Sequence, residues 1–327
     1  MTDSKRAATA ALLLLLPERR HQPTYSASGV RRPGVMNGAG QTAQLCGNKI
    51  TIMKRILVPT DFSPAADRAF HYAVLLAERS GAELIVLNAL SLPLPSYAIQ
   101  PEGIQEYNQC RVAEAGARFA DYRERCPKDI SMTTLVVNGE LKDAVQNAVE
   151  RYDPELLVMG TRGAEGLRTV LGTNAAAVLA ACTVPVLVVP VHYSGGLPAR
   201  IVLAVENEER ESLLAPVFRL QALCGATLRS LHVTEENTDP VRRKERAGAL
   251  SALSQKWEAD FGLDVITSEV ISGNDVNESL EKYVRDQQID LVAMVTHRKR
   301  GLQALFHKSL TREQAFHTRV PLLSLHA

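Results

Sequence analysis

The sequence predicts an α/β protein made of two tandem, doubly wound, open parallel sheets, each with about five strands and helices on both faces. Three observations support this prediction. Short apolar runs alternate with amphipathic stretches from Met53 onward, as expected for parallel strands covered on both faces. The whole series of runs occurs twice. The 327 residues, of which 46% are hydrophobic and 22% charged, suffice for two globular domains with their own cores.

The first copy starts with the buried-strand run RILVPT at residues 55–60. Ser63 and Pro64 then predict a helix start, with Ser63 as the N-cap, and Gly81 predicts the end of that helix. The remaining elements expected in this copy are the strand AELIVLNAL, a proline-rich loop at 92–101, a helix at about 105–125, the strand SMTTLVV, a helix at 141–152, the strand ELLVMG, a helix at 174–181 and the strand VPVLVVP.

The second copy repeats these elements about 135–145 residues later. RIVLAVENEERE corresponds to RILVPTDFSPAA, DLVAMVTHRKRGL to ELLVMGTRGAEGL, and TRVPLLSL to CTVPVLVV. Self-similarity over such a long period indicates duplication of a whole domain. We therefore predict a first domain at 53–190, a linker at 191–199 and a second domain at 200–327. The apolar last strands of the two copies would leave exposed edges, so we expect them to pair as an internal pseudo-dimer.

Residues 1–52 lack sustained periodicity. Their apolar stretch at 7–16 follows two basic residues, as in a secretory signal peptide, but the charged tetrapeptide PERR follows it directly. At Met53 a start residue and two basic residues precede the first strand run. We predict that residues 1–52 are a disordered tail or a misassigned start.

Composition and charge exclude several classes of partner. The first 52 residues contain seven of the 37 Lys and Arg and two of the 36 Asp and Glu, which leaves 30 basic and 34 acidic residues in the remainder. This slightly acidic remainder is a poor platform for nucleic acid, because phosphate contacts need clustered basic charge. No apolar run is long enough to span a membrane. The five cysteines are scattered, with no Cys-x-x-Cys pair, which favours buried thiols in a reducing, cytoplasmic compartment.

The stretch MGTRGAEGLRTVLGTN at 159–174 has the features of a phosphate cradle. Gly160 and Gly163 follow an apolar strand run, and Gly172 precedes a predicted helix. At the carboxyl edge of a parallel sheet, such glycines allow close backbone approach, and their N–H groups can bind an anion together with the helix N-terminus. Asp61, at the end of the first strand, would lie on the same edge. The segment lacks the Walker pattern, and glycines that serve only the turn are the alternative.

The elements RILVPTDFS, G-T-R-G and L-G-T-N, closing on VPVLVVP, together resemble the universal stress protein family over both halves, about 275 residues. This resemblance implies a doubly wound five-stranded α/β fold, a cytoplasmic role in stress response and dimerisation through the last strand, so a homodimer is a further expected assembly. Some members of the family bind ATP, with the pattern G-x2-G-x9-G-[ST] and an Asp after the first strand. ATP, with or without Mg²⁺, is therefore the cofactor that the resemblance implies.

The resemblance also implies roles for individual residues. Pro59 and Thr60 would shape the adenine side of the site, and Asp61 would face the ribose. The further implied residues are Ala89 at the adenine, Gly160 and Gly163 at the ribose and phosphates, and Gly172, Thr173 and Asn174 at the end of the phosphate tail. The sequence departs from the family pattern because eight residues, not nine, separate Gly163 from Gly172. We expect the loop either to tolerate this loss by shortening or to lose the cradle.

The second copy replaces the residues of this pattern. In their place it has Ala204, Val205, Glu206, Val295, Arg298 and Lys308. Branched or long side chains cannot give the close backbone approach that glycine allows. We therefore expect the second domain to be degenerate, with a structural or regulatory role.

The sequence identifies no catalytic site and no metal site. It shows no nucleophile with a neighbouring base and no H-E-x-x-H motif, and His297, His307 and His317 lack paired ligand spacing. Slow ATP hydrolysis would need a water-activating group that the sequence does not reveal. The expected function is a regulatory ATP-binding module, and a non-nucleotide interaction module of the same fold is the alternative.

Overall fold

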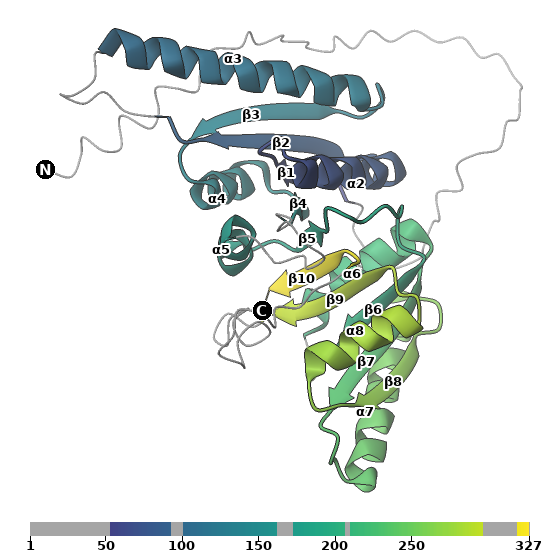
Figure 1. Ribbon diagram of the computed structural model, residues 1–327. Helices are drawn as coiled ribbons and strands as arrows, with labels where there is room; N and C mark the ends of the chain where they lie inside the picture. The colour runs from purple at the N-terminus through teal and green to yellow at the C-terminus, as the bar shows by residue number, and fades with distance from the viewer. Residues whose placement is uncertain (1–52, 93–100, 162–172, 207–209, 297–318, 327) are drawn as a thin grey trace, which may run out of the picture. The chain divides into compact units, whose positions relative to one another are not determined.

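The computed structural model describes residues 53–92, 101–161, 173–206, 210–296 and 319–326. The predicted tail at 1–52 and two of the predicted cradle glycines, Gly163 and Gly172, lie outside these residues. Within them, strands and helices alternate along the chain, which confirms the predicted α/β class (Figure 1).

The elements follow the predicted order in both halves. Those of the first half are β1 (Arg55–Pro59), α2 (Pro64–Ser80), β2 (Glu83–Leu90), α3 (Pro101–Arg125), β3 (Met132–Asn138), α4 (Leu141–Tyr152), β4 (Leu156–Gly160), α5 (Thr173–Ala181) and β5 (Val186–Val189). Those of the second half are β6 (Arg200–Ala204), α6 (Glu211–Cys224), β7 (Thr227–Thr234), α7 (Pro240–Phe261), β8 (Thr267–Ser272), α8 (Val276–Asp286), β9 (Leu291–Thr296) and β10 (Leu322–His326).

The described strands form one sheet in the order β3-β2-β1-β4-β5-β10-β9-β6-β7-β8. Neighbouring strands are parallel except β5 and β10, which pair antiparallel with Leu187 opposite Leu323. Each half is thus a five-stranded parallel sheet, as predicted, and the two halves are continuous through their last strands. The expected pairing of the apolar last strands is confirmed.

The strands are apolar on both sides because helices cover both faces of the sheet. On β1, Ile56 and Val58 pack in a core with residues of α2 and α3, whereas Leu57 packs on the other side with residues of α4 and α5 (Figure 1). In the second half, α6 and α7 contribute to the first of these cores, and α8 lies on a core of its own. A strand covered in this way has no solvent side, which explains the unbroken apolar runs in the sequence.

Helix α2 has both of its predicted ends. Ser63 Oγ accepts a hydrogen bond from the Ala66 amide at 3.3 Å, and Gly81 closes the helix in the left-handed conformation with φ of 71°. The prediction for α3 was wrong at its start, because the helix begins at Pro101 and not near residue 105. Proline fits the first turn of a helix, where its missing N–H has no intrahelical partner to lose.

A carboxylate occupies the same structural position in both halves. Glu155, directly before β4, accepts hydrogen bonds from the two backbone amides at the start of β1 at 3.2 and 2.8 Å. Asp290, directly before β9, accepts from the two amides at the start of β6 at 3.1 and 2.9 Å. The duplication therefore extends to individual hydrogen bonds, although the acidic residue has changed from glutamate to aspartate.

Candidate functional site

The strand order creates a switch point between β1 and β4. The chain proceeds from β1 outward to β2 and β3, and then returns to the other side of β1 to form β4 and β5. Ligands of open α/β sheets bind where the loops after two such strands diverge. Asp61 follows the carboxyl end of β1, and Gly160 ends the neighbouring strand β4. Two of the predicted residues therefore lie at the switch point of the first half.

The turn after β1 is fixed by its own side chains. Thr60 is buried, and its Oγ1 accepts a hydrogen bond from the Phe62 amide at 2.9 Å. Asp61 is exposed, and its Oδ1 accepts from the Ser63 amide at 3.0 Å. Phe62 is left-handed with φ of 59°, a conformation that costs a bulky residue on the order of 1–3 kcal/mol. The turn thus holds the Asp61 carboxylate at the surface in a defined direction.

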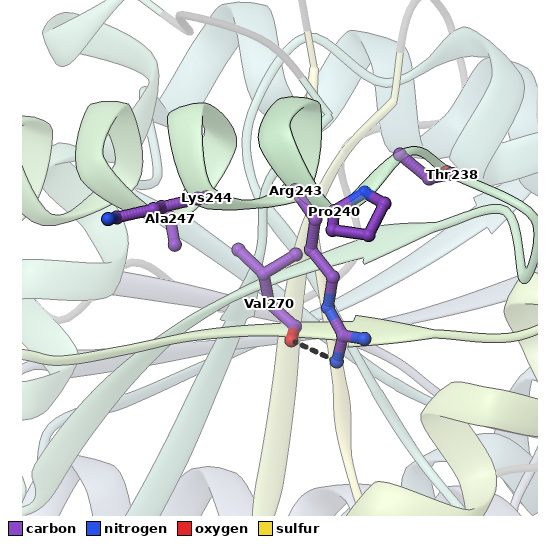
Figure 2. Close-up of a pocket in the computed structure, with 6 residues that line it drawn as sticks. All are labelled: Thr238, Pro240, Arg243, Lys244, Ala247 and Val270. Carbon is purple, nitrogen blue, oxygen red and sulfur yellow. Dashed lines mark hydrogen bonds between the residues drawn. The ribbon is translucent and has the colours of Figure 1, made fainter.

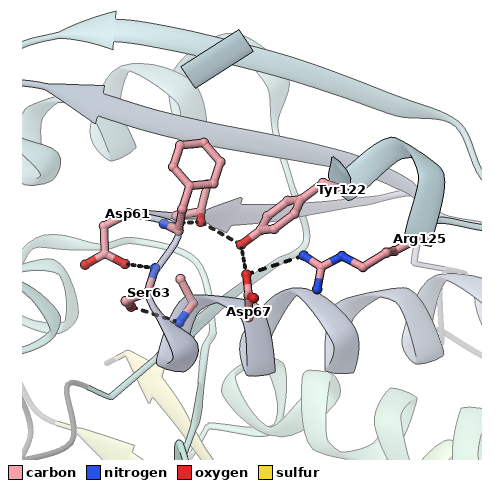
Figure 3. Close-up of polar contacts among 8 residues, drawn as sticks. Asp61, Ser63, Asp67, Tyr122 and Arg125 are labelled. Atoms are coloured by element: carbon pink, nitrogen blue, oxygen red, sulfur yellow. Dashed lines mark hydrogen bonds and ion pairs between the residues drawn. The ribbon is translucent and has the colours of Figure 1, made fainter. Parts of the chain in front are cut away.

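Side chains from α2 and α3 support this turn (Figure 3). The Tyr122 hydroxyl lies 3.0 Å from Thr60 Oγ1 and donates to Asp67 Oδ1 at 2.6 Å. Arg125 donates to the same carboxylate oxygen at 3.4 Å, and its guanidinium lies 4.7 Å from the centre of the Tyr122 ring. Burial, with a smaller contribution from Asp67, raises the pKa of Tyr122, so the phenol stays protonated at neutral pH. This cluster has no local sequence signal, because 62 residues separate Tyr122 from Thr60.

Two buried polar atoms close to the carboxyl ends of strands of this half lack hydrogen-bond partners among the described residues. They are Asn88 Oδ1 near the end of β2 and Thr161 Oγ1 directly after β4. The two residues are only 4% and 3% exposed. Asn88 is tied to the turn through its other end, since its Nδ2 donates to the Thr60 carbonyl at 2.7 Å. Buried polar groups usually have partners, so these two atoms mark places where a ligand or water can bind. Their sequence signal was a polar residue within or directly after an apolar strand run.

Gly160 is explained by packing within the protein. A Cβ at this position would lie 2.2 Å from the Ala65 carbonyl oxygen and 2.4 Å from its carbon, both in the first turn of α2. A larger residue would therefore collide with the backbone of that helix. The close approach that glycine permits is used here by α2, so the identity of residue 160 does not by itself indicate a ligand.

The other predicted residues occupy several places along the same strand ends. Pro59 is the buried last residue of β1, and Ala89 lies half-buried on β2 on the side of α4 and α5. Thr173 and Asn174 are the first residues of α5. Because Gly163 and Gly172 lie outside the described residues, the phosphate cradle and the effect of its short loop stay predictions.

The end of β6 in the second half corresponds to the end of β1 but carries different residues. The carbonyl of Val205, after β6, accepts a hydrogen bond from His232 Nδ1 at 2.7 Å, as the Thr60 carbonyl does from Asn88. Val205 lacks a hydroxyl, and the half-buried Val295 stands in place of Gly160. Helix α6 has 14 residues and α2 has 17, and both end at a left-handed glycine. The shortening therefore lies at the start of α6. The corresponding end of α2 is the one that packs against Gly160 in the first half. Arg298 and Lys308 lie outside the described residues.

A cavity of about 330 Å³ lies in the second half, between the start of α7 and the strand β8 (Figure 2). Arg243 crosses it and donates to the Val270 carbonyl at 3.5 Å. The helix start beside it is already capped, because Asp239 Oδ1 accepts from the Val241 amide at 2.8 Å. The residues around the cavity are Thr238, Pro240, Arg243, Lys244, Ala247 and Val270. They include none of the predicted site residues.

In the part of the chain that the structure describes, no group of three or more His, Cys, Asp or Glu side chains could hold a metal ion. No helix there is long and apolar enough to cross a membrane.

Comparison with known proteins gives two matches to one family within the chain. Residues 53–190 and 199–326 both match the universal stress protein family. The chain is 27% identical over 145 residues to a universal stress protein of Methanocaldococcus jannaschii, which covers 43% of this chain and 85% of the relative. It is 30% identical over 143 residues to universal stress protein G of Salmonella typhimurium, and this alignment covers 42% of this chain and 98% of the relative.

Solved structures match across both halves. A universal stress protein from Archaeoglobus fulgidus aligns with a TM-score of 0.62 and 16% identity, over 83% of this chain and 98% of that chain. A functionally unknown protein from Pseudomonas aeruginosa aligns with a TM-score of 0.52 and 14% identity, over 84% and 92%. At such identities the likeness shows a shared fold.

Proposed function

The chain belongs to the universal stress protein family, with one match at 53–190 and a second at 199–326, and we propose that it is a cytoplasmic stress-response protein whose first domain binds ATP as a regulatory ligand. The second domain, which lacks the corresponding side chains at its own turn, serves as a structural partner. No catalytic step is part of this proposal.

The buried Thr161 hydroxyl beside the switch point, which has no hydrogen-bond partner among the described residues, carries the proposal. Leaving a buried polar group without a partner costs about 1–3 kcal/mol, and a ligand that bonds to this group would remove the cost. An adenine nucleotide suits the surroundings, because the exposed Asp61 carboxylate can accept hydrogen bonds from ribose hydroxyls. The start of α5 at Thr173 offers a helix N-terminus to the phosphates.

Titration calorimetry of the full chain with ATP, with and without Mg²⁺, tests the proposal. Asp61→Asn removes the charge of the ribose acceptor and keeps its size. Because a hydrogen bond to a charged group contributes about 1.5–3 kcal/mol, we expect this variant to raise Kd by about 10- to 100-fold. Asp121→Asn is the matched control, since Asp121 is also exposed but lies on α3. Equal affinities of the wild type and Asp61→Asn would remove Asp61 from the site.

A non-nucleotide interaction module is the second candidate, and the packing of Gly160 against Ala65 favours it. If the glycines serve only the turn, millimolar ATP will give no heat of binding and no thermal shift. A nucleotide present at about 100 times its Kd would stabilise the protein by about 2.7 kcal/mol. Release of ADP and phosphate from bound ATP would instead indicate slow hydrolysis, which neither candidate function includes.

A further inference from the structure

The left-handed Phe62 is the strained point of the candidate site. It lies between Asp61 and Ser63, so its backbone conformation sets the direction in which the Asp61 side chain leaves the end of β1. A bulky residue persists in this conformation only where its surroundings hold it. The groups that hold Phe62 therefore also determine where Asp61 points.

Two kinds of contact hold Phe62. Its amide donates to Thr60 Oγ1 at 2.9 Å. Its ring packs edge-on against two aromatic rings of α3, with centroid distances of 5.2 Å to Phe119 and 5.6 Å to Tyr122. The rings of α3 thus help to fix the conformation of the turn, although α3 contributes none of the predicted binding residues.

The chemistry of the groups fixes the direction of the hydrogen bonds. The Asp67 carboxylate can only accept, so the single Tyr122 hydroxyl proton is donated to it at 2.6 Å. Thr60 must then donate its own proton to the Tyr122 oxygen at 3.0 Å. The Thr60 oxygen is left as an acceptor for the Phe62 amide. One directed relay therefore runs from the Phe62 amide through Thr60 and Tyr122 to Asp67, whose charge is balanced by Arg125 at 3.4 Å.

The second half lacks this relay. Val205, which corresponds to Thr60, has no hydroxyl to pass a hydrogen bond from the turn to the helices. The relay therefore occurs in the half that also has Asp61 and Gly160, and it is absent from the half in which these residues are replaced.

We propose that Tyr122 is a positioning residue, which holds the Asp61–Phe62 turn through Thr60 and thereby couples nucleotide affinity to the docking of α3. This inference rests on the proposed binding of ATP by the first domain. By linkage, a nucleotide that prefers the ordered turn also favours the docked position of α3, so a partner that contacts α3 can sense the occupied site.

Tyr122→Phe tests the proposal, because it removes the relay hydroxyl and keeps the ring that stacks on Phe70 at 4.1 Å. Tyr72→Phe is the matched control, since Tyr72 is also buried but its hydroxyl has no hydrogen-bond partner among the described residues. Thr60→Val is a second variant, which breaks the same relay with nearly the same shape. The measurements on the full chain are the hydrogen-exchange rate of the Phe62 amide without nucleotide, the urea midpoint, and the Kd for ATP.

We expect Tyr122→Phe and Thr60→Val to exchange the Phe62 amide at least about tenfold faster and to bind ATP about five- to tenfold more weakly, whereas Tyr72→Phe changes neither. The exchange rates of the variants are compared at urea concentrations equally far below the urea midpoint of each variant. This comparison separates loss of the relay from general destabilisation. An unchanged exchange rate in Tyr122→Phe would overturn the relay. Faster exchange with an unchanged Kd would overturn the coupling to binding. If the wild type itself does not bind ATP, the proposed function fails, and the exchange rate still decides whether Tyr122 holds the turn.

Discussion

Gly160 and Ala65 lie so close together that a Cβ on residue 160 would be 2.2 Å from the Ala65 carbonyl oxygen. Gly160→Ala must therefore push the first turn of α2 away from β4. We expect this substitution to lower the free energy of unfolding by about 1–3 kcal/mol, the usual range for overpacking. Urea denaturation of the full chain measures the change.

Gly116→Ala is the control for this prediction. Gly116 lies inside α3, where an added Cβ meets nothing within 4 Å. Because alanine has the higher helix propensity, we expect stability to rise by about 0.4–1 kcal/mol. If Gly160→Ala proved as harmless as Gly116→Ala, the close contact between β4 and α2 would be refuted.

Stability at alkaline pH should depend on Cys224. Burial raises the pKa of this thiol to about 12, whereas a thiol in the unfolded chain ionises near pH 8.5. Above about pH 9 the unfolded state therefore loses a proton that the folded state keeps, so the free energy of unfolding falls as pH rises. We expect Cys224→Ala to flatten this fall between pH 9 and pH 11, as measured by urea denaturation at each pH.

Cys110→Ala, which removes an exposed thiol, is the control variant for this measurement. A residual slope in Cys224→Ala is expected, because burial also raises the pKa of Tyr193 to about 12. Identical slopes for the wild type and Cys224→Ala would contradict the assignment.

On each of the two outer strands of the sheet, a backbone carbonyl accepts a hydrogen bond from an arginine of a helix. The outward carbonyl of Met132 in β3 accepts from Arg123 of α3 at 2.8 Å, and the carbonyl of Val270 in β8 accepts from Arg243 of α7 at 3.5 Å. Unpaired strand edges can recruit other strands, and charged groups oppose this. We expect Arg123→Ala to increase self-association, measured as the weight-average mass in analytical ultracentrifugation.

The hydrogen bond of Arg123 is shorter than that of Arg243. We therefore expect Arg243→Ala to increase self-association less than Arg123→Ala does. Arg118→Ala is the control, because Arg118 is exposed on the same helix. A mass for Arg123→Ala equal to that of Arg118→Ala would show that the arginine does not protect the edge of β3.

The sequence predicted the strands and most helix boundaries well, because these depend on local patterns. Unbroken apolar runs identify strands covered on both faces, and Ser63 with Gly81 mark the two ends of α2. The predicted start of α3 near residue 105 was wrong, because the proline at 101 is typical of loops and also of first helical turns. Pairing of β5 with β10 was predictable from the apolar character of both last strands.

The candidate site was only partly predictable. Asp61 and Gly160 follow from the rule that loops after neighbouring parallel strands meet at one edge. Tyr122 has no local signal, because its bonds to Thr60 and Asp67 join residues 62 and 55 positions apart. The packing reason for Gly160 also depends on the three-dimensional path of α2, and no sequence pattern distinguishes it from a ligand-binding glycine.

The antiparallel pairing of β5 with β10 has a consequence for dilution. Between separate chains, such a contact would weaken as protein concentration fell. Here one chain supplies both strands, and short tethers typically give effective concentrations on the order of millimolar. The contact thus persists at any expression level. Duplication and fusion thus keep the last strand of each copy covered by the last strand of the other.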